Sequence, residues 1–529
     1  MQASDLIAPQ TYNLTSEIEQ YTTDANRIAI KWRSEQGASE NLTYVDLFKR
    51  ANQLANALQE QELGKGDRVL IMLPRMTEAY VTYLGCLKAG LVVVPSSEML
   101  RAKDLSYRIN HGEVKAAIVH APLIGEIDSI QEDTPTLAVK IIVDGEAQGW
   151  LPERSLTDKA SEAFTTVSTH RDDMALLEYT SGTTGQPKGV VHTHAWAYAH
   201  LRTTAKSWLN IEEGDTVWAT AGPGWAKWVW SPFMATLGSG ATGFVYSGKF
   251  EPASYLSMIQ EYGINVLCCT PTEYRLMAKI DHLDHYHLST LKNAVSAGEP
   301  LNREVIDTFC QYFDIDVRDG YGQTESTLLI CNQRDMPLQP GSMGKPTPGN
   351  FVDILTEDGE VAPVGEVGDI GVHKDTQALF KEYFKEPERT NAAYRGDYFL
   401  TGDRAKKDQD GLFWFEGRSD DIIVSSGYTI GPFEVEDALV KHPSVKESAV
   451  VASPDPNRGH VVKAFIILKD PEEAKDASLV KQLQDHVKSL TAPYKYPRKI
   501  EFIDDLPKTT SGKIRRIELR EKEDRMAAK

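Results

Sequence analysis

Residues 179–192 read Tyr-Thr-Ser-Gly-Thr-Thr-Gly-Gln-Pro-Lys-Gly-Val-Val-His, and this stretch decides the class of fold. It follows an apolar run, Met174–Tyr179, that predicts a buried strand, and a helix is expected to begin near His194. Glycines, hydroxyl side chains and a lysine between a strand and a helix are typical of a phosphate-binding loop in an α/β sheet. The spacing differs from a Walker A loop, because proline precedes the lysine and glycine follows it. A flexible surface loop is the alternative.

The bulk composition indicates a protein of several domains. A length of 529 residues exceeds what one hydrophobic core usually supports. The net charge of −19 argues against binding to nucleic acid or to an anionic membrane surface. The odd number of cysteines, five, argues against a disulfide framework, and their spacing does not fit a zinc site. The sequence contains no long uncharged apolar stretch of the kind that spans a membrane. We therefore expect a cytoplasmic protein without a secretory signal or an integral membrane segment.

Short apolar runs alternate with amphipathic segments from Asp67 onward. This alternation predicts an α/β fold of doubly wound layers. Strands are expected at Arg68–Leu73, Leu91–Val94, Ala116–His120, Ile141–Asp144, Asn265–Cys269, Asn293–Ala297 and Ile315–Asp319. Helices are expected at Met76–Lys88, Asp104–His111, Thr272–Lys279 and Asn302–Tyr312.

The pattern changes twice toward the C-terminus. Residues 351–415 contain strand-like runs separated by Gly and Asp turns, which suggests a small β subdomain. After Gly417 the runs follow the order β, α, β, β, α, β, which predicts a small α+β domain. We therefore expect an N-terminal domain over residues 1–416, a hinge over 417–421 and a mobile C-terminal domain over 422–529.

Two further stretches carry groups that suit a nucleotide. The first, Asp319-Gly320-Tyr321-Gly322-Gln323-Thr324-Glu325, combines a tight turn, an aromatic ring for stacking on a purine and a carboxylate for Mg²⁺. The second, Thr401-Gly402-Asp403, places a carboxylate at the end of a strand, where it can bind a ribose diol. Each stretch by itself is also typical of an ordinary turn.

A lysine near the C-terminus lies in a glycine-containing stretch, Pro507-Lys508-Thr509-Thr510-Ser511-Gly512-Lys513-Ile514-Arg515-Arg516. A cation there can stabilise the charge that grows on an α-phosphate when a carboxylate attacks it. A solvated basic tail is the alternative.

The stretch Gly222-Pro223-Gly224-Trp225-Ala226-Lys227-Trp228-Val229-Trp230 is the most distinctive feature on the substrate side. Its tryptophans can form the wall of an apolar acyl pocket, and core packing is the alternative. Its charged residue, Lys227, has the wrong sign to bind the ammonium group of an amino acid.

These motifs resemble, in order, those of the adenylate-forming superfamily, which contains acyl-CoA synthetases, peptide-synthetase adenylation domains and luciferases. The resemblance runs from about Asn41 to Arg520, and the Gly-Trp-Ala-Lys string resembles the medium-chain acyl-CoA synthetases. It implies an AMP-forming ligase that uses ATP, Mg²⁺ and CoA and passes through an acyl-adenylate. Its bacterial relatives imply short, branched or medium-chain fatty acids as substrates.

The resemblance also implies roles for single residues. ATP would be bound by Thr180, Ser181, Gly182, Thr183, Thr184, Gly185, Lys188, Gly298, Glu299, Pro300, Asp319, Gly320, Tyr321, Gly322, Gln323, Thr324, Asp403 and Arg418. Glu325 and Thr184 would hold Mg²⁺, Lys513 and Glu325 would be catalytic, and Asp420 would be the hinge. CoA would contact Ser426, Gly427, Tyr428, Arg458 and Tyr496, and the acyl pocket would contain Gly224, Trp225 and Trp228. Solvated surface positions are the alternative for Arg458 and Tyr496. Thr429 departs from the pattern, because many relatives carry arginine there.

Three other functions remain open. A stand-alone adenylation enzyme would load the phosphopantetheine of a carrier protein instead of CoA. A luciferase-like oxidase would use oxygen, and the tryptophan stretch gives that function little support. A non-enzymatic ligand-binding relative would be expected to lose Lys513, Asp403 or Glu325, and all three are present. A homodimer is compatible with every one of these functions.

Overall fold

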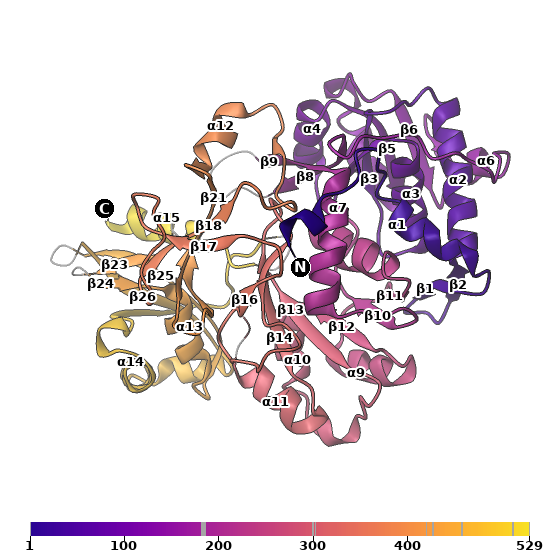
Figure 1. Cartoon of the computed structure of the whole chain (residues 1–529). Helices are drawn as coiled ribbons and strands as arrows, with labels where there is room; N and C mark the ends of the chain where they lie inside the picture. The colour runs from indigo at the N-terminus through magenta and orange to yellow at the C-terminus, as the bar shows by residue number, and fades with distance from the viewer. Residues whose placement is uncertain are drawn as a thin grey trace. The chain divides into compact units, whose positions relative to one another are not determined.

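The apolar runs of the first two thirds of the chain form the strands of two large sheets (Figure 1). The computed structural model describes residues 2–180, 187–298, 301, 303–418, 421–425, 428–455, 459–509 and 513–527. The chain divides into two units. Unit one contains Met1–Pro340, Gly344–Phe351 and His373–Tyr394, and unit two contains Gly341–Met343, Val352–Val372 and Arg395–Lys529.

The first large sheet of unit one is parallel at its centre. Its strands are β1 (Ile28–Arg33), β2 (Ser39–Thr43), β10 (Thr216–Ala219), β11 (Thr242–Tyr246), β12 (Val266–Cys269), β13 (Asn293–Ala297), β14 (Val317–Gly322), β15 (Leu328–Cys331) and β16 (Lys345–Pro346). Within the described residues their order is β16-β15-β14-β13-β12-β10-β11-β1-β2. Neighbours from β14 to β1 pair in parallel, and the edge strands β2, β15 and β16 pair antiparallel.

The second large sheet of unit one carries the predicted phosphate-binding loop. Its strands are β3 (Arg68–Met72), β4 (Val92–Pro95), β5 (Val114–His120), β6 (Val139–Val143), β7 (Leu151–Pro152), β8 (Met174–Thr180), β9 (Lys188–Thr193) and β19 (Glu382–Tyr383). The order across the described part of this sheet is β19-β9-β8-β4-β3-β5-β6-β7. Pairing is parallel from β8 to β7, whereas β9 and β19 are antiparallel.

Unit one contains α-helices besides its two large sheets. They are α1 (Ser16–Glu19), α2 (Tyr44–Glu60), α3 (Thr77–Lys88), α4 (Ala102–His111), α5 (Ile124–Asp128), α6 (Glu153–Thr157), α7 (His194–His200), α8 (Ala226–Trp228), α9 (Pro252–Glu261), α10 (Pro271–Met277), α11 (Arg303–Phe313) and α12 (Pro387–Ala392). On β3, Val69 and Ile71 belong to the buried cluster that includes α2 and α3, whereas Leu70 and Met72 belong to the cluster that includes α4 (Figure 1). Successive side chains of a strand point to opposite faces of the sheet, so both faces of this sheet are apolar and are covered by helices. This arrangement confirms the predicted doubly wound α/β fold.

A strand separates the predicted phosphate-binding loop from the helix that follows it. The apolar run ends in β8, and α7 begins at His194, as predicted. Between them lies β9, which pairs antiparallel with β8. The prediction that the loop joins a strand to a helix is therefore wrong, because the loop joins two antiparallel strands. The buried β-branched pair Val190 and Val191 favours this extended backbone.

Unit two contains two smaller sheets. One consists of β17 (Val352–Leu355), β18 (Val367–His373), β20 (Tyr394–Arg395), β21 (Tyr398–Lys407) and β22 (Phe413–Arg418). The other consists of β23 (Ile423–Ser425), β24 (Tyr428–Ile430), β25 (Val445–Asp455), β26 (Gly459–Leu468) and β27 (Lys499–Phe502). Buried residues of α13 (Pro432–Val440) and α14 (Leu479–Leu490) form one core cluster with residues of the second sheet. A buried residue of α15 (Arg516–Ala527) belongs to a separate cluster with other residues of the same sheet. These elements confirm the expected β subdomain and α+β C-terminal part. The domain boundaries stay predictions, and Asp420 lies outside the described residues.

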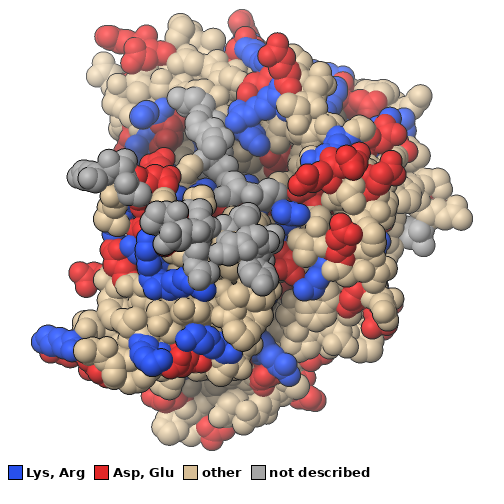
Figure 2. Space-filling model, turned by 90° about the vertical axis from the view of Figure 1, so that its left-hand side faces the viewer, with Lys and Arg blue, Asp and Glu red and all other residues tan. Residues whose placement is uncertain are grey.

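Charged side chains of both signs are mixed on the molecular surface. On the face in Figure 2, acidic and basic side chains are interspersed, and no continuous basic stripe crosses the coloured residues. This distribution fits a protein with a net charge of −19. In the described ranges, none of the helices combines the length and apolar character needed to cross a membrane.

Candidate active site

The two stems of the predicted phosphate-binding loop are neighbours on β8 and β9. Thr180 pairs with Lys188, and Tyr179 pairs with Gly189. The loop residues Ser181, Gly182, Thr183, Thr184 and Gly185 lie outside the described residues. The antiparallel register therefore holds the two described ends of the loop, Thr180 and Lys188, next to each other.

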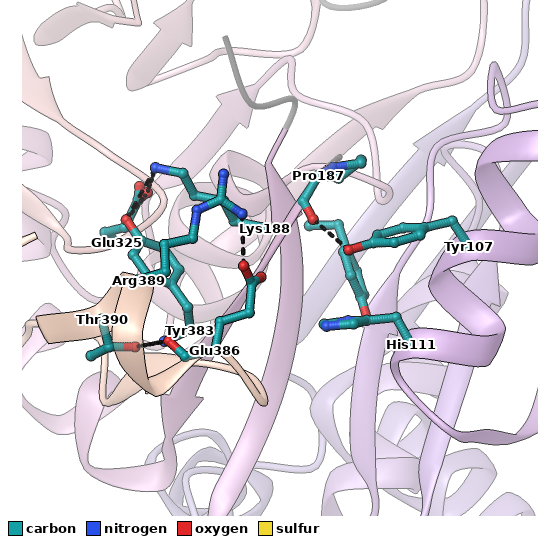
Figure 3. A network of polar contacts seen from close by, with 10 residues as sticks. Tyr107, His111, Pro187, Lys188, Glu325, Tyr383, Glu386, Arg389 and Thr390 are labelled. Atoms are coloured by element: carbon teal, nitrogen blue, oxygen red, sulfur yellow. Dashed lines mark hydrogen bonds and ion pairs between the residues drawn. The ribbon is translucent and has the colours of Figure 1, made fainter. Parts of the chain in front are cut away.

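Two rings of α4 anchor these stems (Figure 3). The Tyr107 hydroxyl donates a hydrogen bond of 3.0 Å to the Pro187 carbonyl oxygen. The Tyr179 hydroxyl lies 2.9 Å from His111 Nδ1, and the rings of Tyr107 and His111 are stacked with centroids 5.2 Å apart. Burial lowers the pKa of His111, which favours the neutral ring and leaves a nitrogen to accept the Tyr179 proton. Both ends of the loop are thus attached to the same helix.

Glu325 lies beside the lysine at the end of the loop (Figure 3). Lys188 Nζ is 4.0 Å from Glu325 Oε1 and 4.8 Å from the centre of the Tyr383 ring. The Tyr383 hydroxyl donates a hydrogen bond of 2.8 Å to the same Glu325 oxygen. Burial and the charge of Glu325 raise the pKa of Tyr383 far above its usual value, so its hydroxyl remains a donor. The structure therefore brings together two residues that the sequence separates widely, Lys188 and Glu325.

Buried rings also hold the backbone on both sides of Glu325. His192 Nε2 donates to the Thr324 carbonyl oxygen at 2.6 Å, and Trp196 Nε1 donates to the Ser326 carbonyl oxygen at 3.0 Å. Burial lowers the pKa of His192 to about 4, so the ring is neutral and carries its proton on Nε2, where the carbonyl accepts it. Side chain and backbone contacts together leave Glu325 little freedom.

Contacts with α12 orient Tyr383, a residue that the sequence motifs did not indicate. Its backbone N–H donates to Thr390 Oγ1 at 3.0 Å, and the Thr390 hydroxyl donates to the Glu386 carbonyl oxygen at 2.9 Å. Arg389 pairs with the Glu386 carboxylate at 2.8 Å (Figure 3). No sequence pattern around Tyr383 indicates a contact with Glu325, which is 58 residues away, so the contact becomes visible only in the fold.

Glu178 is a second buried acid near this position that the motifs did not indicate. Its exposed fraction is 3%, and neither carboxylate oxygen has a hydrogen-bond partner in the part of the chain that is described. Its Oε2 lies 3.9 Å from His192 Nε2, which already donates to Thr324. Burial raises the pKa of Glu178 to about 8, and the charge of Glu325 adds to the increase. Near neutral pH, Glu178 is therefore largely uncharged.

Two of the predicted ATP-binding segments, residues 298–300 and 319–325, lie at adjacent parallel strands. Gly298 follows β13, whereas Asp319 to Gly322 belong to β14 itself. Ala297 of β13 pairs with Gly320 of β14, so Gly298 leaves its strand beside the Asp319 segment. Gly298 has a φ of 107°, which favours glycine. Lys227 Nζ donates to the Ala297 carbonyl oxygen at 2.9 Å, and burial raises the pKa of Asp319 to about 7. The rest of the second segment is Tyr321, Gly322, Gln323 and Thr324, which lead to Glu325, while Glu299 and Pro300 lie outside the described residues.

The residues predicted to bind ribose are cross-strand neighbours in unit two. Asp403 of β21 pairs directly with Arg418 of β22. Asp403 is buried, and its backbone N–H donates to Thr401 Oγ1 at 3.2 Å. The arginine side chain lies over Gly402, with Nη2 3.7 Å from the position of a Cβ atom at that residue. The structure thus places Asp403 and Arg418 together, although the chain separates them by a hairpin.

Lys513 lies on an exposed turn of unit two. Its backbone N–H donates to Thr509 Oγ1 at 3.1 Å, and the Thr509 N–H donates to the Lys513 carbonyl oxygen at 2.8 Å. Residues 510–512 between them lie outside the described residues. The two ends of the turn are therefore bonded to each other, while the lysine itself is exposed to solvent.

The predicted CoA residues also belong to unit two. The ring of Tyr496 contacts two cations, with Lys488 Nζ 4.2 Å and the Arg498 guanidinium carbon 4.7 Å from its centre. Tyr428 begins β24. Ser426, Gly427 and Arg458 lie outside the described residues. Two cations against one aromatic ring provide charges that suit a polyanion such as CoA.

Trp228, predicted to line the acyl pocket, lies in an aromatic cluster of unit one. Its exposed fraction is 1%. Its ring is stacked on Phe233 with centroids 5.4 Å apart and planes inclined by 13°, and it contacts Tyr80 and Tyr83 at 4.8 and 4.6 Å. This packing favours the alternative that Trp228 is a core residue, and its role in the pocket stays a prediction.

The other two predicted pocket residues precede this cluster. A Cβ atom on Gly224 would lie 2.2 Å from the backbone of Ser97, so only glycine allows this close approach. Trp225 is half-buried, which leaves part of its ring accessible. Trp225 therefore suits the wall of a pocket better than Trp228 does.

The donor atoms at Glu325 suit the predicted magnesium ion. The Glu325 carboxylate presents oxygen atoms, which Mg²⁺ prefers, and the Tyr383 hydroxyl orients it. Thr184, the other predicted ligand, lies outside the described residues. A group of three potential ligands with donor atoms within 4.8 Å of one another occurs elsewhere, at the exposed residues His282, Asp284 and His285. Its imidazole nitrogens suit zinc better than magnesium.

Comparisons with known proteins show the family to which the chain belongs. Residues 19–384 match the AMP-binding enzyme family, and residues 434–513 match the AMP-binding enzyme C-terminal domain. The chain is 59% identical over 528 residues to the uncharacterized acyl-CoA ligase YtcI of Bacillus subtilis (strain 168), covering 100% of this chain and 99% of that protein. It is 40% identical to the mitochondrial acyl-coenzyme A synthetase ACSM3 of Mus musculus, covering 97% and 91% of the two chains.

A solved structure supports the same relationship. The anthranilate CoA ligase AuaEII, in complex with anthranoyl-AMP, superimposes with a TM-score of 0.91 at 30% sequence identity, over 100% of both chains. Sequence and fold thus agree along the whole chain. The chain therefore belongs to the AMP-binding enzyme family and is an acyl-CoA ligase of that family.

Proposed function

We propose that the protein activates short, branched or medium-chain fatty acids, forming acyl-CoA, AMP and pyrophosphate from the acid, ATP and CoA. One observation carries the nucleotide part of this proposal. Lys188 at the end of the phosphate loop lies 4.0 Å from Glu325, which ends the second nucleotide-binding segment. The lysine proposed to bind the phosphates and the carboxylate proposed to hold Mg²⁺ are thus neighbours in unit one, which supports the proposal.

In the proposed first half-reaction, the acid carboxylate attacks the α-phosphorus of ATP, and pyrophosphate leaves. Lys188 would bind the phosphates, and Lys513 would stabilise the charge that develops on the α-phosphate. When bound at Glu325 and Thr184, Mg²⁺ would neutralise part of the phosphate charge. Tyr383 would keep the Glu325 carboxylate oriented. No general base is needed, because the acid is already ionised at neutral pH.

In the proposed second half-reaction, the CoA thiolate attacks the carbonyl carbon of the acyl-adenylate, and AMP leaves. The residues on the CoA side would be Gly427, Arg458 and Tyr496. The C-terminal domain would turn about Asp420 between the steps, so that Lys513 serves the first and Gly427 the second. A hinge suits this reaction, because two different groups must reach the same acyl carbon in turn.

The acid class rests on the tryptophan stretch and on the relatives. Residues 222–230 contain no acidic side chain, and their only charged residue, Lys227, donates to a backbone carbonyl. An apolar acid therefore suits this stretch better than an amino acid. The 40% identity with the acyl-coenzyme A synthetase ACSM3 and the resemblance of the Gly-Trp-Ala-Lys string to the medium-chain acyl-CoA synthetases support an aliphatic acid. The likeness to the anthranilate CoA ligase supports an aromatic acid as the second candidate.

A pyrophosphate-release screen tests the proposal. Straight and branched aliphatic acids of about two to twelve carbons, benzoate and anthranilate are compared with and without CoA. We expect acyl-CoA with aliphatic acids and a lower kcat/KM with aromatic ones. Preference for an aromatic acid would overturn the acid class. Thioester formed on a carrier protein but not on CoA would support the stand-alone adenylation enzyme instead.

Substitution of the two tryptophans tests the pocket. Trp225→Ala should raise kcat/KM for longer relative to shorter acids, because it removes an accessible ring. Trp228→Ala should mainly lower the free energy of unfolding, by about 3–5 kcal/mol, because it leaves a cavity in the core. Chain-length profiles and urea denaturation separate these effects. If Trp228→Ala shifts the profile and Trp225→Ala does not, the roles are reversed.

The cytoplasmic location and the homodimer remain predictions from the sequence. Cell fractionation tests the first. Sedimentation velocity of the purified protein tests the second, with a dimer near twice the chain mass of 58.9 kDa as the expected species.

A further inference from the structure

The position of Lys513 depends on the base of its turn. Besides the two bonds between Thr509 and Lys513, the Arg515 N–H donates to the Pro507 carbonyl oxygen at 2.8 Å, and Lys508 pairs with Ile514 in an isolated bridge. The turn is therefore closed on itself, and its orientation in unit two is set by the segments that enter and leave it. The segment that leaves it is α15, which begins three residues after Lys513.

The first residue of α15 forms a forked ion pair with a buried acid of α13. Arg516 Nη2 lies 2.9 Å from Glu436 Oε1 and 2.7 Å from Oε2, and Arg516 Nε lies 3.1 Å from Oε1. Glu436 is 7% exposed, and its Oε1 also accepts a hydrogen bond of 2.7 Å from the Val450 N–H of β25. One carboxylate thus joins α13, β25 and the start of α15. A bidentate arginine fixes direction as well as distance, which a lysine does not.

A second arginine, one helical turn later, binds α15 to the beginning of the C-terminal segment. Arg520 pairs with Asp421, and Arg516 Nη1 also lies 4.0 Å from Asp421 Oδ2. The i and i+4 spacing puts both guanidinium groups on one side of the helix. The first turn of α15 is therefore fixed by ion pairs with two acids, Glu436 and Asp421. The Lys513 turn directly precedes this fixed end of the helix.

We infer that Arg516 is a positioning residue for Lys513. Its forked pair with Glu436 sets the direction in which α15 begins, and with it the place from which Lys513 extends. This inference rests on the proposed role of Lys513 in adenylate formation. Loss of the pair should therefore impair that half-reaction and spare thioester formation, in which Lys513 has no role. A pair that only stabilised the domain would affect both half-reactions alike.

The experiment measures the two half-reactions separately on the full chain. Single-turnover formation of acyl-adenylate is followed from acid and ATP, and thioester formation is followed from supplied acyl-adenylate and CoA. For Arg516→Gln we expect adenylate formation to fall by about 10-fold to 100-fold, because a small displacement of a catalytic group has effects of that size. Thioester formation should change by less than about twofold.

Arg515→Gln is the matched control. Arg515 is the neighbouring arginine, and its side chain pairs with Glu518 on the exposed surface of α15. Both half-reactions should be unchanged in this variant. Arg516→Lys keeps the charge but loses the fork, and it should show a smaller loss confined to adenylate formation. If Arg516→Gln does not yield folded protein, Arg516→Lys decides by the same criterion.

Lys513→Ala separates failure of the inference from failure of the proposed function. If Lys513→Ala impairs adenylate formation alone while the Arg516 variants impair both half-reactions in equal proportion, or neither, the inference is wrong. If Lys513→Ala itself affects both half-reactions equally, the proposed role of Lys513 is wrong, whatever the Arg516 variants do.

Discussion

The two residues predicted to be catalytic, Glu325 and Lys513, lie in regions that are built in opposite ways. Glu325 is buried in unit one, with its carboxylate bound by Tyr383 and its backbone neighbours bound by the rings of His192 and Trp196. Lys513 is exposed in unit two, and the turn that carries it is closed by backbone hydrogen bonds. One group is thus fixed by contacts to its own side chain and flanking backbone, and the other lies on an exposed turn that is closed by hydrogen bonds at its base.

A buried carboxylate and an exposed lysine are positioned by different means. A carboxylate that serves a single ligand position can be fixed by burial and hydrogen bonds on every side. A lysine that must enter and leave a site has to stay solvated, so its placement must come from the element that carries it. We therefore expect substitutions near Glu325 to act through its direct contacts, and substitutions near Lys513 to act through the base of its turn.

Removal of the exposed lysine should have the largest effect. Lys513→Ala should lower the rate of acyl-adenylate formation by about a thousand-fold, because it removes the cation that opposes charge developing on the α-phosphate. Thioester formation from supplied acyl-adenylate should stay within about twofold. Rapid-quench measurement of both half-reactions checks this. Equal losses in the two half-reactions would mean that Lys513 does not act in adenylate formation alone, and they would contradict the contrast with Glu325.

Neutralisation of the buried carboxylate should have the next largest effect. Glu325→Gln keeps the size of the side chain but removes its charge, and it should lower adenylate formation by about a hundredfold. The Mg²⁺ concentration for half-maximal rate should also rise, because the proposed ligand loses its charge. Rates measured over a magnesium titration test this. An unchanged magnesium dependence would mean that Glu325 does not hold the ion.

Loss of a single contact to Glu325 should be milder. Tyr383→Phe removes the hydrogen bond to Glu325 Oε1 and leaves the ring in place. A hydrogen bond to a charged group contributes about 1.5–3 kcal/mol, and the lower end of this range corresponds to about tenfold in rate, so adenylate formation should fall by at least about tenfold. Tyr312→Phe, at an exposed tyrosine of unit one, is the matched control and should have wild-type rates. Equal rates in both variants would show that Glu325 does not depend on this contact.

The smallest effect concerns the dependence of stability on pH. The pKa of Glu178 is about 8 in the folded chain and near 4.5 when exposed, so folding takes up a proton between these values. Stability is fully present below the lower pKa and is lost as the pH rises toward the higher one. Glu178→Gln removes this loss, and relative to wild type it should gain about 1 kcal/mol between pH 7 and pH 8. Urea denaturation at both pH values tests this. A constant difference between the two proteins would mean that Glu178 is already ionised.

Local patterns predicted much of the fold and of the candidate site. The alternation of apolar runs located strands such as β3, β5, β12 and β13 and helices such as α3 and α11, because side-chain periodicity depends only on neighbouring residues. It did not locate β1, β2, β10, β11, α2 or α9. The strand β9 was missed, since Lys188–Thr193 is short and directly precedes a helix. The nucleotide-binding segments were recognised from glycines, hydroxyl groups and carboxylates that are contiguous in the chain.

Contiguous motifs in the chain were enough to predict the reaction class and candidate residues such as Thr180, Lys188 and Lys513. The distant side chains that contact such residues became evident from the packed fold alone. Tyr383, His192 and the pair of Arg516 with Glu436 reach their partners across 58, 132 and 80 residues. Such contacts leave no periodic pattern, because they arise when strands and helices pack. The burial that raises the pKa of Glu178 has the same origin, since it depends on the packed fold and not on its neighbours in the chain.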